Sequence, residues 1–408
     1  MIASEQSTSR SFPEAHKRRF GVFVLGAGFS APAGLPLAPE LWAEVRRKAQ
    51  LGRGSGRFDD DLRAYIDFRN VCYREGLTPE TVNFEDFMAF LDVEHYLGLR
   101  GSDTLSDDGN ETQILVKTLI GQILTERTPQ MGKIPDIYLR FAEMLQPNDL
   151  VLTFNYDVLL ERALETVGTP FRLFPERYSI IHDGYAPFAE CDNSHEEVIV
   201  LKLHGSVDWF DRKRYRKFDD YRVAEGLPAG HFHPVFGPER NLHTVPVVDG
   251  PRFPDDPLRE MHRVLNVEEL YRGSSLSLAP PSLLSPSSAK ILYSRKQRDF
   301  WWGLSQWGFL NFGMSIIGFS LSGADDYVRQ VLYRIVKNYQ NSYWKDGVLD
   351  RKKSPLVLVD FRRSAKDKED FRRRYAFVNW SRARTYFNGL DQKALELLGN
   401  AQQYCGNG

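Results

Sequence analysis

The stretch "GVFVLGAGFSAPAGLP", residues 21–36, decides the fold of this chain. Its apolar residues 22–25 predict a short buried strand, because they run directly into glycines. Gly26 would permit a tight turn there, Gly28 would let the backbone approach a phosphate, and Ala31 would pack close to the sheet. Backbone N–H groups of the following helix would face a pyrophosphate, aided by the helix dipole. The motif is short, and it fits a simple tight turn equally well.

A dehydrogenase would need a second feature, an acidic residue that ends another strand about 20 residues further on. The sequence at that distance is "PELWAEVRRKAQ", residues 39–50, which predicts a helix. Glu40 and Glu44 lie inside this predicted helix, where they are poorly placed to bind a ribose. The sequence therefore argues against hydride transfer.

The composition is that of a soluble globular protein. The chain has 408 residues, of which 42% are apolar and 26% charged, and its net charge is -1. Such balance argues against a dedicated nucleic-acid surface, so the basic runs at residues 212–217 and 372–374 predict solvated or partner-facing edges. Little self-repulsion opposes assembly, which favours a homo-oligomer.

Cysteine usage and hydropathy exclude several classes of protein. Cys72, Cys191 and Cys405 are the three cysteines, and none forms a CxxC pair, which excludes a four-cysteine zinc module and a disulfide framework. The first 20 residues lack the apolar core of a signal peptide, and no apolar run reaches the ~18–20 residues that cross a bilayer. We expect a cytoplasmic protein without a membrane partner.

Buried strands alternate with helices along most of the chain, which predicts an α/β fold: a Rossmann-like parallel sheet with helices on both faces. Strands are expected at residues 20–25, 149–154, 198–203, 311–320 and 355–360. Helices are expected near residues 40–48, 83–99, 112–126, 134–145, 158–167, 298–307, 324–339 and 392–398. The domains predicted are a loose arm (1–19), the Rossmann-like domain (20–360) with a helical insertion (about 42–147) and an irregular insertion (about 207–297), and a helical extension (361–408).

Four of the strands end in polar sequences, and the loops at the carboxyl ends of parallel strands gather on the ligand-binding edge of a sheet. These sequences are "GAGFSA" (26–31), "TFNYD" (153–157), "KLHGS" (202–206) and "GFSLSGADD" (318–326). Asn155 or Asp157 could cap the next helix, but capping does not require both. A lone histidine such as His204 is most often structural, although imidazole is well suited to accept a proton near neutral pH. Gly318, Ser320 and Ser322 fit a turn with an N-cap, or a close approach to a ligand.

In this order the four motifs resemble those of the sirtuin family. That family has a Gly-Ala-Gly-x-Ser loop, a Thr-Gln-Asn-Ile-Asp motif, a His-Gly base and a late Gly-x-Ser turn. This chain reads "GAGFS" from Gly26, "TFNYD" around Asn155, His204 followed by a glycine, and "GFS" from Gly318. The resemblance spans roughly residues 20–360, and it implies NAD+ as the substrate.

Two departures from the sirtuin pattern refine the resemblance. Residues 207–317 contain no cysteine, whereas sirtuin deacylases carry a four-cysteine zinc module in this interval. The second departure is the helical insertion, with "NFEDFMAFLD" at residues 83–92. In both departures the chain resembles the divergent, zinc-less prokaryotic sirtuin-like group of antiphage defence, whose members hydrolyse NAD+ to nicotinamide and ADP-ribose. Three alternatives stay open: a non-catalytic sensor of NAD+ or ADP-ribose, a protein deacylase and an ADP-ribosyltransferase.

The resemblance also implies a role for each candidate residue. Asn155 would orient the attacking water or the ribose, Asp157 would position the nicotinamide ribose or amide, and His204 would act as the general base. The residues that would contact the pyrophosphate and ribose are Gly26, Ala27, Gly28, Ser30, Gly318, Ser320 and, at the end of the last predicted strand, Asp360. The resemblance further implies a homo-oligomer with a helicase-like ATPase partner.

Overall fold

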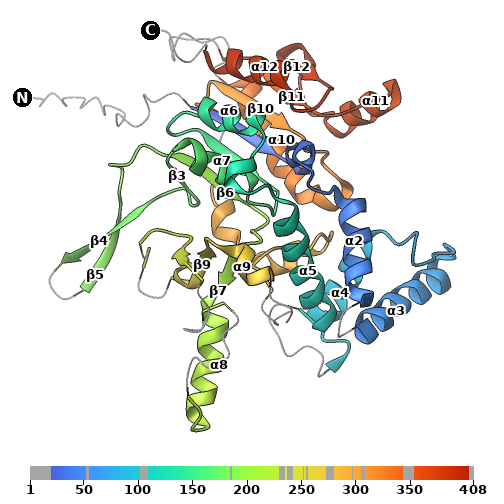
Figure 1. Cartoon of the computed structure of the whole chain (residues 1–408). Helices are drawn as coiled ribbons and strands as arrows, with labels where there is room; N and C mark the ends of the chain where they lie inside the picture. Colours follow the sequence, from blue (N-terminus) through green and yellow to red (C-terminus); the bar gives the residue numbers. More distant parts are fainter. Residues whose placement is uncertain are drawn as a thin grey trace, which may run out of the picture.

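The computed structural model describes most of the chain (Figure 1). The described residues are 20–51, 55–101, 109–183, 186–228, 235–236, 242–250, 252–253, 256–272, 280–295, 297–304, 308–342 and 353–403. The predicted arm at residues 1–19 and several parts of the second insertion lie outside these ranges.

A seven-stranded sheet forms the centre of the described chain, and all of its strand pairs are parallel. The spatial order is β12-β11-β10-β1-β2-β6-β3. The strands are β1 (Gly21–Leu25), β2 (Leu150–Thr153), β3 (Phe171–Arg172), β6 (Val198–Lys202), β10 (Gly313–Ile317), β11 (Leu356–Val359) and β12 (Ala383–Tyr386). The chain leaves β1 toward β2 and later returns on the other side of β1 at β10. The strand order therefore reverses between β1 and β10, where open α/β sheets bind their ligands.

The central strands are buried along their whole length, because their residues are apolar and helices cover the sheet. Every residue of β1, β2, β6, β10 and β11 is buried. The helices next to the sheet include α6 (Asp136–Met144), α7 (Leu159–Val167), α10 (Asp326–Asn341) and α12 (Gln392–Gln403). Phe141 of α6, for example, meets Phe23 of β1 edge to face. The structure thus confirms the predicted Rossmann-like parallel sheet.

The helical insertion forms as predicted between β1 and β2 (Figure 1). Before α6 it contains α2 (Ala38–Leu51), α3 (Ser55–Tyr73), α4 (Phe84–Tyr96) and α5 (Glu111–Arg127). Asn83 caps α4, because its side chain accepts from the N–H groups of Glu85 and Asp86. Trp42 of α2 stacks on Phe84 of α4 with ring centroids 4.7 Å apart, so aromatic packing joins these helices.

The second insertion is more regular than predicted. β7 (Trp209–Asp211), β9 (Met261–Val264) and β8 (Thr244–Pro246) form a small antiparallel sheet. The basic run at residues 212–217 opens α8 (Arg212–Ala224), which extends away from the sheet in Figure 1. A run so rich in charge lacks the apolar stripe that predicts a helix, which is why the sequence indicated an irregular segment.

Three further elements differ from the sequence prediction. The helix expected over residues 298–307 is a short 3-10 helix, Gln297–Trp301, and residues 305–307 lie outside the described ranges. β4 (Tyr178–Asp183) and β5 (Ala186–Cys191) form a hairpin that was not predicted. The C-terminal extension contains α11 (Ala365–Arg374) and α12, but it also adds β12 to the sheet beside β11.

Candidate active site

The first and fourth motifs lie in direct backbone contact. The Gly26 N–H donates to the Ile317 carbonyl at 3.0 Å, and the Gly28 N–H donates to the Gly318 carbonyl at 2.8 Å. A Cβ on Gly318, whose φ is +61°, would lie 2.2 Å from the Gly28 carbonyl carbon. A Cβ on Gly28 would lie 2.8 Å from Gly318 Cα. In the structure, therefore, Gly28 provides a close approach between two loops, a role that the sequence did not predict.

The helix after β1 is short. α1 (Ala27–Ser30) is a single turn, and it continues into a 3-10 turn, Ala31–Ala33, that ends at Gly34 with φ +91°. Ala27 is exposed, Gly28 is half-buried and Ser30 is buried, so one side of this turn faces outward and the other faces the sheet.

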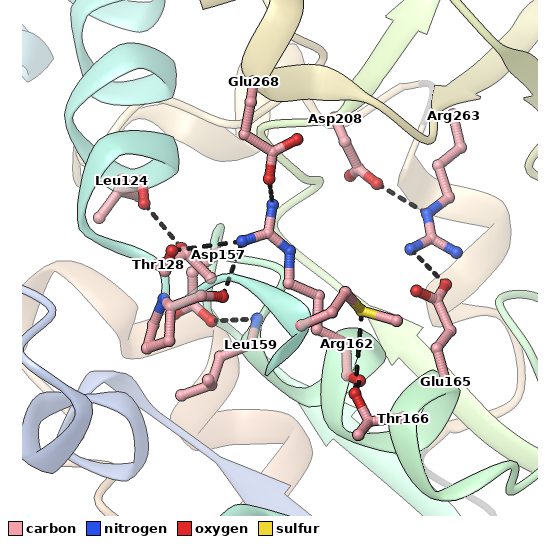
Figure 2. A network of polar contacts seen from close by, with 12 residues as sticks. Leu124, Thr128, Asp157, Leu159, Arg162, Glu165, Thr166, Asp208, Arg263 and Glu268 are labelled. Carbon is pink, nitrogen blue, oxygen red and sulfur yellow. Dashed lines mark hydrogen bonds and ion pairs between the residues drawn. The ribbon is translucent and has the colours of Figure 1, made fainter. Parts of the chain in front are cut away.

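Asn155 joins the second motif to the first. Its side-chain amide donates to the Gly26 carbonyl at 3.0 Å and to Ser30 Oγ at 3.1 Å. Asp157 has a different position: one carboxylate oxygen accepts from the Leu159 N–H at 3.0 Å, at the start of α7 (Figure 2). Asp157 therefore satisfies one backbone N–H at the start of α7, where Val158 occupies the N-cap position without a side-chain hydrogen bond, and the Asn155 side chain binds the β1 loop.

His204 follows β6 and is only 4% exposed. Its Nε2 lies 2.6 Å from the Tyr327 hydroxyl, and the ring of Phe154 meets its ring at a steep angle with centroids 5.0 Å apart. The pKa of the His204 imidazole is lowered from 6.5 to about 3, mainly because burial disfavours the charged form and partly because the Lys290 cation lies nearby. Asp325 opposes this shift. The imidazole is therefore neutral at physiological pH.

The four motifs are connected through aromatic contacts as well as hydrogen bonds. Phe154 of the second motif stacks on Phe319 of the fourth, with centroids 4.5 Å apart, and also contacts His204 of the third. Gly205 has φ +82°, and a Cβ there would lie 2.1 Å from the Ser282 carbonyl oxygen, so the residue after His204 must be glycine. The structure thus brings Gly26, Gly28, Ser30, Asn155, His204 and Gly318 to one edge of the sheet.

Ser320 and Asp360 lie further along this edge. Ser320 is exposed, and its carbonyl accepts from Arg374 at 3.0 Å. Asp360 directly follows β11, and its carboxylate accepts from the Phe361 N–H at 2.6 Å and from Arg362 at 3.1 Å. Burial raises the pKa of Asp360, and Arg362 opposes that rise. A ribose at Asp360 would therefore share its carboxylate with Arg362.

Sequence reasoning missed several polar side chains next to His204. The Lys290 ammonium lies 2.6 Å from Asp325 Oδ1, which is 4.0 Å from His204 Nε2. Ser322 Oγ lies 3.3 Å from both Asp325 Oδ2 and Glu85 Oε1. In the sequence, Asp325 lies at the start of the helix predicted near residues 324–339, and nothing near Lys290 indicates that it would pair with Asp325.

A buried ionic network supports the loops of the second and third motifs. Lys202 of β6 pairs with Glu161 of α7 at 2.7 Å and also donates to the Asp157 carbonyl. Figure 2 shows the adjoining part, in which Arg263 bonds to Asp208 at 2.8 Å and to Glu165 at 2.9 Å. These pairs hold α7 against β6, and so they fix Asp157 relative to the strand that carries His204.

A Rossmann-like sheet with glycine loops at the reversal of strand order, and with a polar amide and a neutral imidazole beside them, is typical of nucleotide-binding α/β proteins. Within that class, residues 149–262 match the SIR2-like domain family. The match begins just before β2 and includes Asn155, Asp157 and His204. Residues 149–262 are therefore similar to a SIR2-like domain, as the motifs in that stretch indicated.

Two solved structures are similar to this chain over most of its length. One, from work on the structural basis of sirtuin substrate affinity, is 12% identical with a TM-score of 0.33 and 93% of each chain covered. The other is Sir2Tm bound to a propionylated peptide, at 11% identity and a TM-score of 0.28, with 95% of this chain and 94% of that chain covered. No curated protein matches the sequence.

The described residues contain neither a candidate metal site nor a membrane-spanning helix. Those residues include no group of three or more His, Cys, Asp or Glu side chains that could hold a metal ion. None of the helices seen in that part of the chain is long and apolar enough to span a bilayer.

Proposed function

We propose that this protein is an NAD+ hydrolase, which cleaves the bond between nicotinamide and ribose to give nicotinamide and ADP-ribose. The observation that carries the proposal is the pairing of Asn155 with the glycine loop, beside the neutral imidazole of His204. A polar amide and an unprotonated base at the reversal of strand order are the groups that water needs for attack on a bound nucleotide.

The chemistry requires little more than orientation and a proton acceptor. Loss of nicotinamide passes through an oxocarbenium-like state with charge at the ribose carbon, and the protein must stabilise that state more than bound NAD+. In this proposal Asn155 orients the attacking water or the ribose, and Asp157 positions the nicotinamide ribose or amide. His204 accepts a proton from water or from a ribose hydroxyl, which it can do because burial keeps it neutral.

The remaining candidate residues would bind the rest of NAD+. Gly26, Ala27, Gly28 and Ser30 would hold the pyrophosphate, with the backbone of Gly318 beside them. The exposed hydroxyl of Ser320 would bond a phosphate or ribose oxygen, and Asp360 would contact a ribose. The proposal includes no zinc, because residues 207–317 lack the cysteines of the sirtuin zinc module.

The cellular role proposed is that of a cytoplasmic effector that depletes NAD+ in antiphage defence. It rests on the resemblance of the motifs and insertions to that group. Uncontrolled hydrolysis of NAD+ would be toxic, so an off state is expected. We propose that control comes from homo-oligomerisation and from a separate helicase-like ATPase partner.

The test is a product assay on the purified chain with NAD+ alone. Release of nicotinamide and ADP-ribose in equal amounts supports hydrolysis, whereas binding of NAD+ without products would indicate the sensor. Nicotinamide release that requires an acyl-lysine peptide would indicate a deacylase, and ADP-ribose attached to protein would indicate a transferase.

A further inference from the structure

The imidazole of His204 is surrounded by a set of titratable side chains that come from several elements. Tyr327 of α10 and Tyr156 after β2 present phenols, with ring centroids 6.1 and 6.3 Å from the imidazole. Asp325 lies before α10 and Lys290 opens the 3-10 helix Lys290–Tyr293. Burial raises the pKa of both phenols well above 10, so the charges that face His204 are those of Asp325 and Lys290.

Lys290 is unusual because it is a nearly buried cation placed beside a base. Its side chain is 3% exposed, its ammonium is 2.6 Å from Asp325 Oδ1, and it lies 5.8 Å from the centre of the Tyr327 ring. Tyr327 in turn contacts His204 Nε2. Asp325 therefore faces both Lys290, at ion-pair distance, and His204, at 4.0 Å.

We propose that Lys290 and Asp325 are positioning residues that set the proton affinity of His204, with Lys290 holding the base weak in the resting protein. The inference rests on the proposed function, because it assigns a role around the same base. When Lys290 neutralises Asp325, the carboxylate is less able to stabilise an imidazolium at His204. A shift of Lys290 away from Asp325 would leave a buried carboxylate facing His204 and would make it a stronger base.

The helical insertion holds the segment that carries Lys290. Tyr293, three residues further on, donates to the Asp92 carbonyl of α4 at 3.0 Å and lies 2.7 Å from His95 Nδ1. Ser285, five residues before Lys290, donates to the buried Asp92 carboxylate at 3.2 Å. Glu85 of the same helix approaches Asp325 through Ser322. The position of α4 therefore determines where Lys290 sits relative to Asp325.

The first test measures the protonation of His204 without using activity. Ring-labelled histidine gives an NMR signal for each of the nine histidines, and His204→Gln identifies the one that belongs to His204. We expect the His204 imidazole to stay neutral down to about pH 4.5 in the wild type. In Lys290→Met the midpoint of its titration should be higher by roughly 1 to 3 pH units. Lys290→Arg, which keeps the cation, should behave like the wild type. An unchanged titration in Lys290→Met overturns the inference.

The second test uses the pH profile of kcat/KM for nicotinamide release. Because catalysis by a general base rises with its basicity, Lys290→Met should increase kcat/KM at pH 8 roughly 3- to 30-fold and move the acid limb of the pH profile to higher pH. Asp325→Asn should lower kcat/KM and move the acid limb to lower pH, and the double variant should have a profile near that of the wild type. Simple damage to packing would lower activity in both single variants, so a loss in both contradicts the inference. Lys393→Met, at an exposed lysine of α12, is the matched control.

The two tests separate the two proposals. If the His204 titration moves as expected but no variant releases nicotinamide, the proposed function fails and the control of proton affinity stands. If the wild type hydrolyses NAD+ and Lys290→Met neither titrates differently nor changes in rate, the inference alone fails.

Discussion

The side-chain amide of Asn155 donates to Ser30 Oγ at 3.1 Å, and this bond joins two loops whose residues are 125 positions apart in the chain. The same amide donates to the Gly26 carbonyl at 3.0 Å. Asn155 thus donates two hydrogen bonds to the glycine loop. This connection holds the glycine turn and the second motif together at one edge of the sheet.

Asn155→Ala should lower kcat for NAD+ hydrolysis by at least ~100-fold, the scale on which a positioned catalytic group is lost. The reason is that the variant removes both the group that orients water and the bonds that hold the β1 loop. Nicotinamide release is the measurement, with the melting temperature as the check on folding. Asn388→Ala, at an exposed asparagine, is the matched control and should retain full activity. Full activity in Asn155→Ala would remove this residue from the mechanism.

His204 should make the free energy of unfolding depend on pH. Its pKa in the folded state, about 3, lies below the value of 6.5 expected in the unfolded chain. The unfolded chain therefore binds a proton first, so the stabilisation is fully present above pH 6.5 and declines as the pH falls toward 3, by up to about 5 kcal/mol. Denaturant unfolding of the wild type and of His204→Gln between pH 7 and 4.5 measures it. Equal slopes in the two proteins would show that His204 is not buried as a neutral group.

Gly318→Ala should destabilise the protein more than a left-handed backbone alone can explain. Gly34 is the internal comparison, because its φ is +91° and nothing lies within 4 Å of a Cβ there, whereas a Cβ on Gly318 meets Gly28 at 2.2 Å. We expect a cost of about 1–2 kcal/mol for Gly34→Ala from backbone strain, and an additional 1–3 kcal/mol or so for Gly318→Ala from the clash. Chemical denaturation measures both. Equal costs would mean that the two loops separate easily.

The buried pair of Lys202 and Glu161 supplies a fourth prediction. Lys202→Met leaves Glu161, which is 1% exposed, without its cation, and should cost about 3–5 kcal/mol of folding free energy. Replacing both residues, as Lys202→Met with Glu161→Leu, should recover a large part of that loss, because no buried charge then remains unpaired. A double variant as unstable as the single one would show that the Lys202 bond to the Asp157 carbonyl is what matters.

The sheet was predictable in its centre and not at its margins. Strands such as β1 and β11 are apolar throughout because helices cover both of their faces, and that pattern is visible in sequence. β12 reads "ARTY" and lies at the edge of the sheet, where none of its four residues is fully buried, so it lacks the apolar run of the central strands. The helix α8 was missed for another reason, because its charged sequence contains no apolar stripe that would predict a helix.

The residues of the candidate site that directly follow a buried strand were predictable from the sequence. Those contributed by helices, turns and the second insertion were not. Asn155 and His204 were found because each stands just beyond a buried strand on the ligand edge. Tyr327 and Asp325 approach His204 from a helix and a turn, and Lys290 pairs with Asp325 from the second insertion, so only the tertiary fold brings them together. Their sequence neighbourhoods show ordinary helix and loop residues, without a spacing that indicates a partner.

The most direct test of the central claim is to incubate the purified chain with NAD+ alone and to quantify nicotinamide and ADP-ribose. The same assay is then repeated with the protein encoded next to it, and Asn155→Ala and His204→Ala serve as controls. The account predicts equal amounts of the two products from the wild type, and a loss of at least ~100-fold in each variant. Undiminished hydrolysis in both variants, or NAD+ binding without any release of nicotinamide, would contradict it.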